Sequence, residues 1–509
     1  MPRRVILDGG AVRAPEVVAV ARHGAAVALG SEARRRLDLA RAVVEGVVAR
    51  GEAVYGVNTG FGDLSRVRIP SDATAVLQRN LIMSHAAGVG EPLPREVVRA
   101  MLLLLAASLA RGRSGVRPVV AAYLVAFLNG GVTPVVPSKG SVGASGDLAP
   151  LAHIGLVLMG EGEATIEDEA LPGRVALERI GLAPLELAAK EGLAIINGTH
   201  LMAAVGALAV HDAGILVESA EVAAAMALEA LRGSDVPFDP RIHAARGQEG
   251  QIATAGRLRA LLRDSAIIPS HRADDPRVQD PYTLRCIPQV IGAVRDTVAH
   301  CARVVDAELG AVTDNPLVFP DEDGDGDGVM LSGGNFHGQP VAMALDILAI
   351  ALAELAAFAE RRVYLLLDDR EPLADRLPPF LAVEPGLNSG YMIAQYVAAS
   401  LVAENAVLAA PAGLHSIPTS AGMEDFVSMG ATAATKLRAV VDNAAHVVAI
   451  ELLCGAQGVE YRRPLRAGTG VEEALRRVRA VVPPLARDRS LHPDIVALAR
   501  AVRAGHFAL

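Results

Sequence analysis

The stretch Val341-Ala-Met-Ala-Leu-Asp-Ile-Leu-Ala-Ile-Ala-Leu-Ala-Glu-Leu-Ala-Ala-Phe-Ala-Glu-Arg-Arg-Val-Tyr-Leu-Leu-Leu367 decides the fold class of this chain. It is long and apolar enough to cross a bilayer, but charged side chains interrupt it. These are Asp346, Glu354, Glu360, Arg361 and Arg362. Because such charges are costly in hydrocarbon, we interpret the stretch as a helix of the protein core and expect no membrane partner.

Helical patterns recur on both sides of this stretch. We predict one helix that begins at Ser31 and ends before Gly51, and others over Arg95–Ala110, Val119–Leu128, Leu201–Leu231, Pro288–Leu309, Pro340–Leu366, Tyr391–Leu408, Ala431–Leu453 and Asp494–Ala504. Near the amino end, the β-branched runs Val5–Leu7 and Val17–Val20 favour a small hairpin. The predicted fold class is therefore mainly α, a long-helix bundle with a small amount of β near the N-terminus. We divide it into an N-terminal domain, 1–193, and a long-helix domain, 194–509.

Composition narrows the class of protein. The 509 residues are 51% apolar with no Trp, so Ala, Val and Leu must build the core, and the net charge of −9 gives no reason to expect nucleic acid. Three cysteines without a CxxC motif argue against structural zinc and disulfides and favour the cytoplasm. The acidic run Asp321–Gly328 imitates a calcium loop, but Ser332 replaces the Glu needed at position 12, so we predict no metal.

The tripeptide Ala144-Ser145-Gly146 carries the most unusual chemistry. The run Gly143–Gly146 lacks the last Gly of a nucleophile elbow and the ending of a phosphate loop, and taken alone it indicates a tight turn before Pro150. The tripeptide could also cyclise. If the Gly146 nitrogen attacks the Ala144 carbonyl and two waters are lost, a methylidene-imidazolone forms, whose exposed methylene is a strong electrophile. Cyclisation requires a strained backbone that a rigid fold maintains.

The segment around this tripeptide resembles the signature of a known family. It reads Gly140-Ser-Val-Gly-Ala-Ser-Gly-Asp-Leu-Ala-Pro-Leu-Ala-His153 and is similar to that of the aromatic amino acid ammonia-lyases. Further matching segments, which extend the resemblance over nearly the whole chain, are Tyr55–Gly62, Asn80–Gly88, Lys190–Thr199, Gln279–Arg285, Asp314–Pro316, Gly334–His337, Glu384–Gly390 and Glu424-Asp425. The resemblance implies the long-helix bundle of the ammonia-lyase and fumarase type.

The resemblance also implies an activity and a set of site residues. The reaction is elimination of ammonia from an L-amino acid, with Ala144, Ser145 and Gly146 forming the methylidene-imidazolone autocatalytically and no external cofactor. Because the β-hydrogen is barely acidic, a well-placed base is needed as well, and by similarity this is Tyr55. Tyr282 would act in catalysis and would share a helical face with Arg285, the carboxylate clamp. The substrate-binding residues implied by the resemblance are His85, Asn197, Gln279, Arg285, Asn315, Phe336 and Glu424.

Substrate choice rests on two of these positions. Ser84-His85 resembles the histidine-selective members, and Glu424 stands where relatives specific for phenylalanine or tyrosine carry Gln, so the resemblance implies conversion of L-histidine to trans-urocanate in histidine catabolism. A carboxylate beside an imidazole can hold its N–H. The sequence departs from the histidine-selective pattern at positions that could favour a less polar ring, namely His200, Ile287, Gln339, Met423 and Phe426.

Several alternatives remain open at this point. The same electrophile would serve a phenylalanine or tyrosine ammonia-lyase or a 2,3-aminomutase. The fumarase and argininosuccinate lyase class is disfavoured because its SSxMPxKxN loop is absent, and a helical scaffold protein would keep the full sequence mass. The resemblance further implies a homotetramer, assembled through the long-helix domain, in which each active site draws loops from three subunits.

Overall fold

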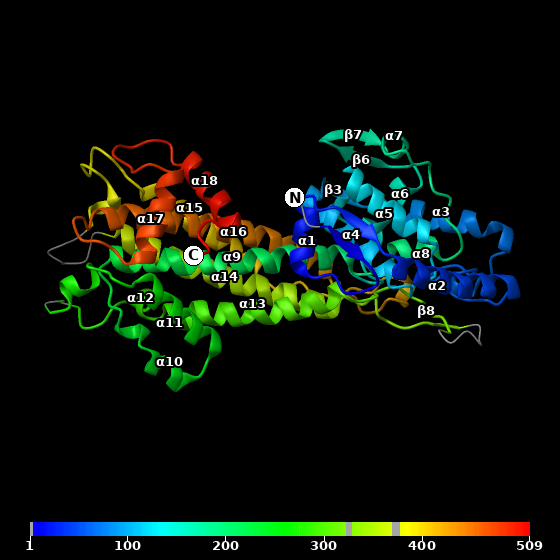
Figure 1. Ribbon diagram of the computed structural model, residues 1–509, viewed down its shortest axis with the longest axis horizontal. Coiled ribbons are helices and arrows are strands. Elements are labelled where there is room, and N and C mark those ends of the chain that lie inside the picture. The colour runs from blue at the N-terminus through cyan, green and yellow to red at the C-terminus, as the bar shows by residue number, and fades with distance from the viewer. Residues whose placement is uncertain (1–3, 274, 276, 322–327, 369–376) are drawn as a thin grey trace. The chain divides into compact units, whose positions relative to one another are not determined.

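The structure, a computed structural model, describes residues 4–273, 275, 277–321, 328–368 and 377–509 (Figure 1). The predicted mainly α class is confirmed. The α-helices are α1 (Ala14–Ala21), α2 (Ser31–Arg50), α3 (Thr74–His85), α4 (Arg95–Ala110), α5 (Pro118–Gly130), α6 (Leu148–Leu158), α7 (Gly173–Arg179), α8 (Glu191–Ile196), α9 (His200–Ala230), α10 (Pro240–Arg246), α11 (Glu249–Leu261), α12 (Tyr282–Arg285), α13 (Ile287–Leu309), α14 (Gln339–Leu367), α15 (Met392–Leu408), α16 (Gly430–Glu460), α17 (Thr469–Val481) and α18 (His492–Arg503). Most of the acidic run Asp321–Gly328, at 322–327, lies outside the described residues.

The predicted hairpin near the amino end is wrong. Residues Val17–Val20 belong to α1, which has Pro15 in its first turn. The Glu16 carboxylate caps this helix by accepting a hydrogen bond from the Arg13 N–H at 3.1 Å. Strand β1 (Val5–Leu7) instead pairs in parallel with β2 (Val27–Leu29). Parallel neighbours need a crossover connection, and α1 supplies it. Helix capping therefore outweighs the β-propensity of the valines.

Short strands also occur outside the first thirty residues. They are β3 (Val89–Pro92), β4 (Thr133–Pro134), β5 (Pro137–Lys139), β6 (Glu163–Ile166), β7 (Glu169–Pro172), β8 (Leu317–Phe319) and β9 (Val329–Leu331). They form the antiparallel sheets β3-β5, β4-β6-β7 and β8-β9. Figure 1 shows β6 and β7 beside α7. These strands are too short to form a core and serve to brace loops between helices.

The chain folds into two compact units, each built from three separated stretches. Unit 1 comprises 1–211, 302–346 and 411–435, and unit 2 comprises 212–301, 347–410 and 436–509. In unit 1, small apolar side chains of α2 pack on β8 around Val44 and Val318. In unit 2, α11 and α13 meet so closely that a Cβ on Gly250 would lie 2.1 Å from the Gly292 carbonyl oxygen. The boundary at 193/194 stays a prediction.

The stretch that decides the fold class forms α14, and its interpretation as a core helix is confirmed. Its charges find partners inside the protein: Asp346 accepts hydrogen bonds from the Ala412 and Gly413 N–H groups, and the buried Arg362 guanidinium binds the Glu451 carboxylate at 2.9 Å. By length and composition alone, α9, α14 and α16 could cross a membrane, but 83%, 67% and 83% of their most apolar stretches are buried in the protein.

Candidate active site

Glycines shape the loop that carries Ser145. Gly146 has a φ of +81°, and a Cβ there would lie 2.2 Å from the Gly198 carbonyl oxygen. Gly143 has a φ of +66°, and a Cβ there would lie 2.2 Å from Ser428 Oγ. No L side chain fits either place without displacing its neighbours. The loop is therefore clamped against the segment before α9 on one side and the start of α16 on the other.

Asp147 ties this loop to the first turn of α9. Its backbone N–H donates to the Gly198 carbonyl at 2.7 Å, and its carboxylate accepts from the Leu201 and Met202 N–H groups at 3.0 and 3.1 Å and from Ser141 Oγ at 3.0 Å. Burial raises the pKa of Asp147 to about 6 despite these hydrogen bonds. The fully bonded carboxylate holds the backbone on both sides of Ser145 in one geometry.

Two predicted site residues contact Ser145 directly. The Ser145 hydroxyl donates to Glu424 Oε1 at 2.9 Å, and Asn197 Nδ2 donates to the Ser145 carbonyl at 2.8 Å. Glu424 is itself held by Thr419 Oγ1, which donates to Oε2 at 2.8 Å. The buried Asn197 Oδ1 has no partner among the described residues. A rigid tripeptide with a bonded carbonyl, an acceptor for its hydroxyl and an unused amide oxygen beside it fits the predicted methylidene-imidazolone and an amino acid.

A cavity of about 970 Å³ adjoins Ser145, and all the residues that line it belong to unit 1. It brings together seven of the predicted site residues: Tyr55, His85, Ser145, Asn197, Asn315, Phe336 and Glu424. Ala144 and Gly146 flank Ser145 without lining the cavity. Four loops and two helix ends that are far apart in the sequence thus converge on one space.

His85 ends α3 and lines the cavity. Its Nδ1 lies 2.8 Å from the Leu81 carbonyl oxygen, which can only accept, so Nδ1 carries the proton and Nε2 is left as an acceptor. Burial lowers the pKa of His85, although the Leu81 carbonyl and the Glu424 charge oppose this. A neutral imidazole therefore faces the cavity at neutral pH.

Tyr55 lies in the glycine-rich loop before α3. Its ring packs edge-on against Phe61, with 6.2 Å between centroids, and its hydroxyl oxygen lies 3.5 Å from the Gly62 nitrogen. Burial raises the pKa of Tyr55, and the negative charge of Glu424 adds to the rise while the Gly62 N–H opposes it. The groups of unit 1 that surround Tyr55 therefore keep it a protonated phenol at neutral pH.

Asn315 and Phe336 line the cavity from the stretch between α13 and α14. Asn315 Oδ1 accepts from the Gly333 N–H at 2.7 Å, which orients its amide group. The preceding Asp314 forms a buried ion pair with Lys190 at 2.7 Å. This stretch is thereby anchored from within unit 1, and Phe336 forms part of the cavity wall.

The remaining predicted site residues belong to unit 2. Gln279, Tyr282 and Arg285 do not line the cavity. The predicted sharing of a helical face is confirmed: in the single turn of α12, the Arg285 guanidinium carbon lies 4.6 Å from the centre of the Tyr282 ring. Arg285 Nε is buried without a partner among the described residues.

The cavity walls also contain residues that our sequence interpretation missed. They are mostly apolar and come from α3, α6, α8 and the loop after Tyr55: Leu64, Val67, Ile69, Leu77, Leu81, Leu148, Leu193 and Ile196. Polar Asn80 also lines the cavity and lay within a matching segment without a role. In the sequence, such apolar positions look like ordinary helix core. Of the departures from the histidine-selective pattern, Met423 lines the cavity, whereas His200, Ile287, Gln339 and Phe426 do not.

His200 is the first residue of α9, and its surroundings lead us to predict that the free energy of unfolding depends on pH. It is buried, neither ring nitrogen has a partner among the described residues, and burial lowers its pKa to about 4. As the pH falls below 6.5, His200 takes up a proton in the unfolded chain but stays neutral in the folded chain. The free energy of unfolding therefore decreases until about pH 4, where His200 is protonated in the folded chain as well. The loss is roughly 3 kcal/mol.

His200→Gln, which cannot take up this proton, should therefore flatten the fall in unfolding free energy between pH 6.5 and 4, measured by urea denaturation. The exposed His23→Gln is the matched control. Equal slopes for His200→Gln and the wild-type chain would contradict the assignment.

Comparison with known proteins bears on this geometry. A family model described as aromatic amino acid lyase matches residues 12–480. Histidine ammonia-lyase of Symbiobacterium thermophilum is 54% identical over 98% of this chain and 96% of its own length. The structure of histidine ammonia-lyase from Trypanosoma cruzi matches with a TM-score of 0.90 at 41% identity, over 99% of this chain and 94% of that one. Tyrosine aminomutase from Streptomyces globisporus matches with a TM-score of 0.92 at 37% identity, over 99% and 97%.

Proposed function

Because the chain belongs to the aromatic amino acid lyase family and is an ammonia-lyase, we propose that it releases ammonia from L-histidine and leaves trans-urocanate. The observation that carries the proposal is the cavity in which the Ser145 hydroxyl, the Glu424 carboxylate and the neutral His85 imidazole meet. These groups suit a substrate that is itself an imidazole with an amino group.

We assign the electrophile to Ala144-Ser145-Gly146. The clamped backbone at Gly146, the Asn197 bond to the Ser145 carbonyl and the Glu424 bond to the Ser145 hydroxyl support cyclisation of this tripeptide. Glu424 accepts a hydrogen bond from the Ser145 hydroxyl, which must leave as water during cyclisation. Its carboxylate is therefore placed to exchange a proton with that hydroxyl. Once formed, the methylidene-imidazolone supplies an electrophile that turns the amino group into a good leaving group. No external cofactor is needed for this chemistry.

Substrate binding follows from the polar groups that line the cavity. Glu424 accepts the one N–H of the neutral substrate imidazole, and His85 lines the same cavity beside it. Asn197 Oδ1 and Asn315 hold the amino and carboxylate ends. Phe336 and Leu193 exclude water from the reacting carbons.

Tyr55 removes the β-hydrogen in this proposal. Since burial and Glu424 raise its pKa, formation of the phenolate needs a cation nearby. Among the described residues that line the cavity there is no Arg or Lys. The substrate ammonium group and a guanidinium from outside unit 1 would supply that charge.

We propose that Gln279, Tyr282 and Arg285 reach the cavity from a partner subunit of a homotetramer. Exposed apolar side chains support an assembly: Ile393, Tyr396 and Val397 form one exposed face of α15. A run of large apolar side chains at i, i+3 and i+4 facing water is typical of a helix that packs against another molecule.

The cysteines support a cytoplasmic location. Among the described residues, Cys286, Cys301 and Cys454 form no disulfide. Burial raises the pKa of Cys301 to about 11 and that of Cys454 further, so both stay protonated and unreactive. A reducing compartment suits such a chain, and we propose the cytoplasm.

Product analysis tests the proposed function. Purified protein is incubated separately with L-histidine, L-phenylalanine and L-tyrosine, and the products are separated and identified by mass. We expect urocanate and one equivalent of ammonia from histidine, with much slower conversion of the other two. A β-amino acid with no free ammonia would identify a 2,3-aminomutase, and preferred conversion of phenylalanine or tyrosine would contradict the assignment of Glu424 and His85.

Glu424→Gln should shift this preference. The amide keeps the shape but loses the charge that holds the imidazole N–H, so kcat/KM for histidine is expected to fall roughly 10- to 100-fold. The fall for a slow apolar aromatic substrate should be much smaller. The neighbouring Asp425→Asn, whose side chain does not line the cavity, is the matched control. An equal loss for all substrates would show that Glu424 acts on ring formation rather than on substrate choice.

A further inference from the structure

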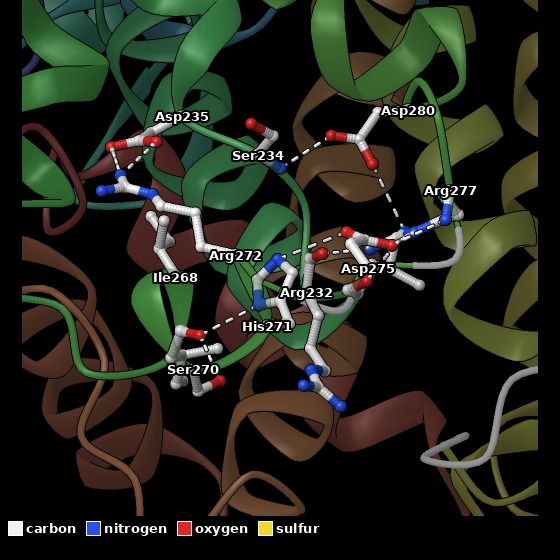
Figure 2. Close-up of polar contacts among 12 residues, drawn as sticks. Arg232, Ser234, Asp235, Ile268, Ser270, His271, Arg272, Asp275, Arg277 and Asp280 are labelled. Carbon is white, nitrogen blue, oxygen red and sulfur yellow. Dashed lines mark hydrogen bonds and ion pairs between the residues drawn. The ribbon is translucent and has the colours of Figure 1, made fainter.

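We propose that Arg277 and Asp280 are positioning residues that fix the segment carrying Tyr282 and Arg285 to the end of α9. The inference rests on the proposed function, because it assumes that Tyr282 and Arg285 act on the substrate. It concerns residues of unit 2 alone, and Figure 2 shows the contacts that carry it.

Arg277 binds the carboxyl end of α9. Its Nη1 donates to the Leu231 carbonyl at 3.2 Å. Its Nη2 donates to the Arg232 carbonyl (Figure 2). These two carbonyls lie just beyond the last turn of α9. Carbonyl groups at this end of a helix have no intrahelical hydrogen-bond donor, and they carry partial negative charge. A guanidinium there both satisfies the carbonyls and complements the dipole. The backbone at Arg277 is thereby fixed to a long helix.

Asp280 forms the second anchor, three residues later. Its Oδ2 accepts from the Ser234 N–H at 2.7 Å, and its Oδ1 pairs with Arg277 Nη1 at 3.3 Å (Figure 2). The side chain is only 3% exposed. A buried carboxylate is stable only with such partners, so the pair joins 277–280 to 231–234 on two sides.

Two further groups hold the Arg277 guanidinium in place. The Asp275 carboxylate accepts from the Arg277 backbone N–H at 2.9 Å and from its Nε at 3.3 Å. His271 Nε2 lies 3.8 Å from the same carboxylate (Figure 2). The other ring nitrogen, Nδ1, lies 3.1 Å from the Ile267 carbonyl oxygen. Contacts with residues that precede Gln279 in the sequence therefore fix the orientation of the Arg277 guanidinium.

The side chains that follow the anchors depend on the backbone for their position. Tyr282 is 68% exposed, and its ring lies against the Arg285 guanidinium. Val278, between the anchors, is 99% exposed. Because α12 is a single turn that begins two residues after Asp280, the anchors set the direction in which Tyr282 and Arg285 project. A displacement of about 1 Å in such groups can cost about 100-fold in rate.

Arg277→Gln and Asp280→Asn test the inference, with Arg272→Gln as the matched control. Arg272 belongs to the same cluster but pairs with Asp235 at the surface and does not touch 277–285 (Figure 2). For both anchor variants we expect kcat/KM to fall roughly 10- to 100-fold, with KM raised and kcat lowered together. Amide hydrogen exchange at Leu284, Arg285 and Cys286 should accelerate. Arg272→Gln should change neither quantity.

The double variant and a conservative variant separate positioning from stability. Because the anchors share one contact, the double variant should lose less than the product of the single losses. Arg277→Lys keeps the charge but not the fork that reaches both carbonyls, so it should fold and lie between wild type and Arg277→Gln. A melting temperature lowered in any of these variants, with KM, kcat and exchange at 284–286 unchanged, would overturn the inference. A wild-type chain inactive on histidine would contradict the proposed function instead, and the variants would then be compared on the amino acid that it converts.

Discussion

Ser145→Ala is expected to abolish turnover of histidine, with kcat reduced about 1000-fold or more. Alanine has no hydroxyl to lose, so the exocyclic methylene cannot form and the amino group remains a poor leaving group. The fold should survive, because the change removes only the hydroxyl that cyclisation itself removes as water, and Thr419 still holds Glu424. The measurement is the initial rate of urocanate formation at saturating histidine.

Ser71→Ala provides the control for this prediction. Ser71 is an exposed serine in the same unit and lies outside the cavity. Its variant should match the wild-type rate, and both variants should unfold at nearly the same urea concentration as the wild-type chain. A Ser145→Ala protein that turns over histidine at a rate near that of wild type would contradict the assignment of the electrophile.

Arg285→Gln is expected to lower kcat/KM roughly 100-fold, mostly through KM. A guanidinium offers a carboxylate two parallel donors, and glutamine offers one without charge. Arg285 can bind a substrate carboxylate, since its Nε is buried and has no hydrogen-bond partner among the described residues. Steady-state kinetics with histidine measures the loss, and a variant with unchanged KM would show that another group binds the substrate carboxylate.

Coexpression of Ser145→Ala and Arg285→Gln chains then tests which chain supplies Arg285. If each active site takes Ser145 from one subunit and Arg285 from another, random assembly of equal amounts should give an unimpaired pair at about a quarter of the sites. Activity would reappear in the mixture although neither parent is active enough to explain it. A mixture no more active than the average of its parents would contradict a shared site.

Much of the fold could be predicted from residue spacing. Helix α4 has the predicted bounds Arg95–Ala110 at both ends, because a long apolar run between Pro94 and Gly112 leaves little freedom in where a helix begins and ends. Helix α2 ends as expected, with Gly51 in the left-handed conformation. The error at Val17–Val20 arose because β-propensity depends on the surroundings, which a short local pattern does not contain.

Seven of the residues that line the cavity could be picked out from the sequence, whereas their contacts could not. Ser145 and Glu424 are 279 positions apart, and their hydrogen bond exists only because the 140–147 loop and the start of α16 pack together. Leu77, Leu193 and Ile196 line the cavity but have the spacing of ordinary core positions. The part played by Arg277 and Asp280 was hidden for the same reason, since their partners are backbone groups at the end of α9.

The mass of the purified wild-type chain, measured before any substrate is added, tests the central claim most directly. We predict a mass lower than that of the sequence by two water molecules, with the whole loss confined to the peptide that contains Ala144-Ser145-Gly146. The full sequence mass in a chain that nevertheless converts histidine to urocanate would contradict the claim, because the reaction would then proceed without the electrophile that we propose forms at Ser145.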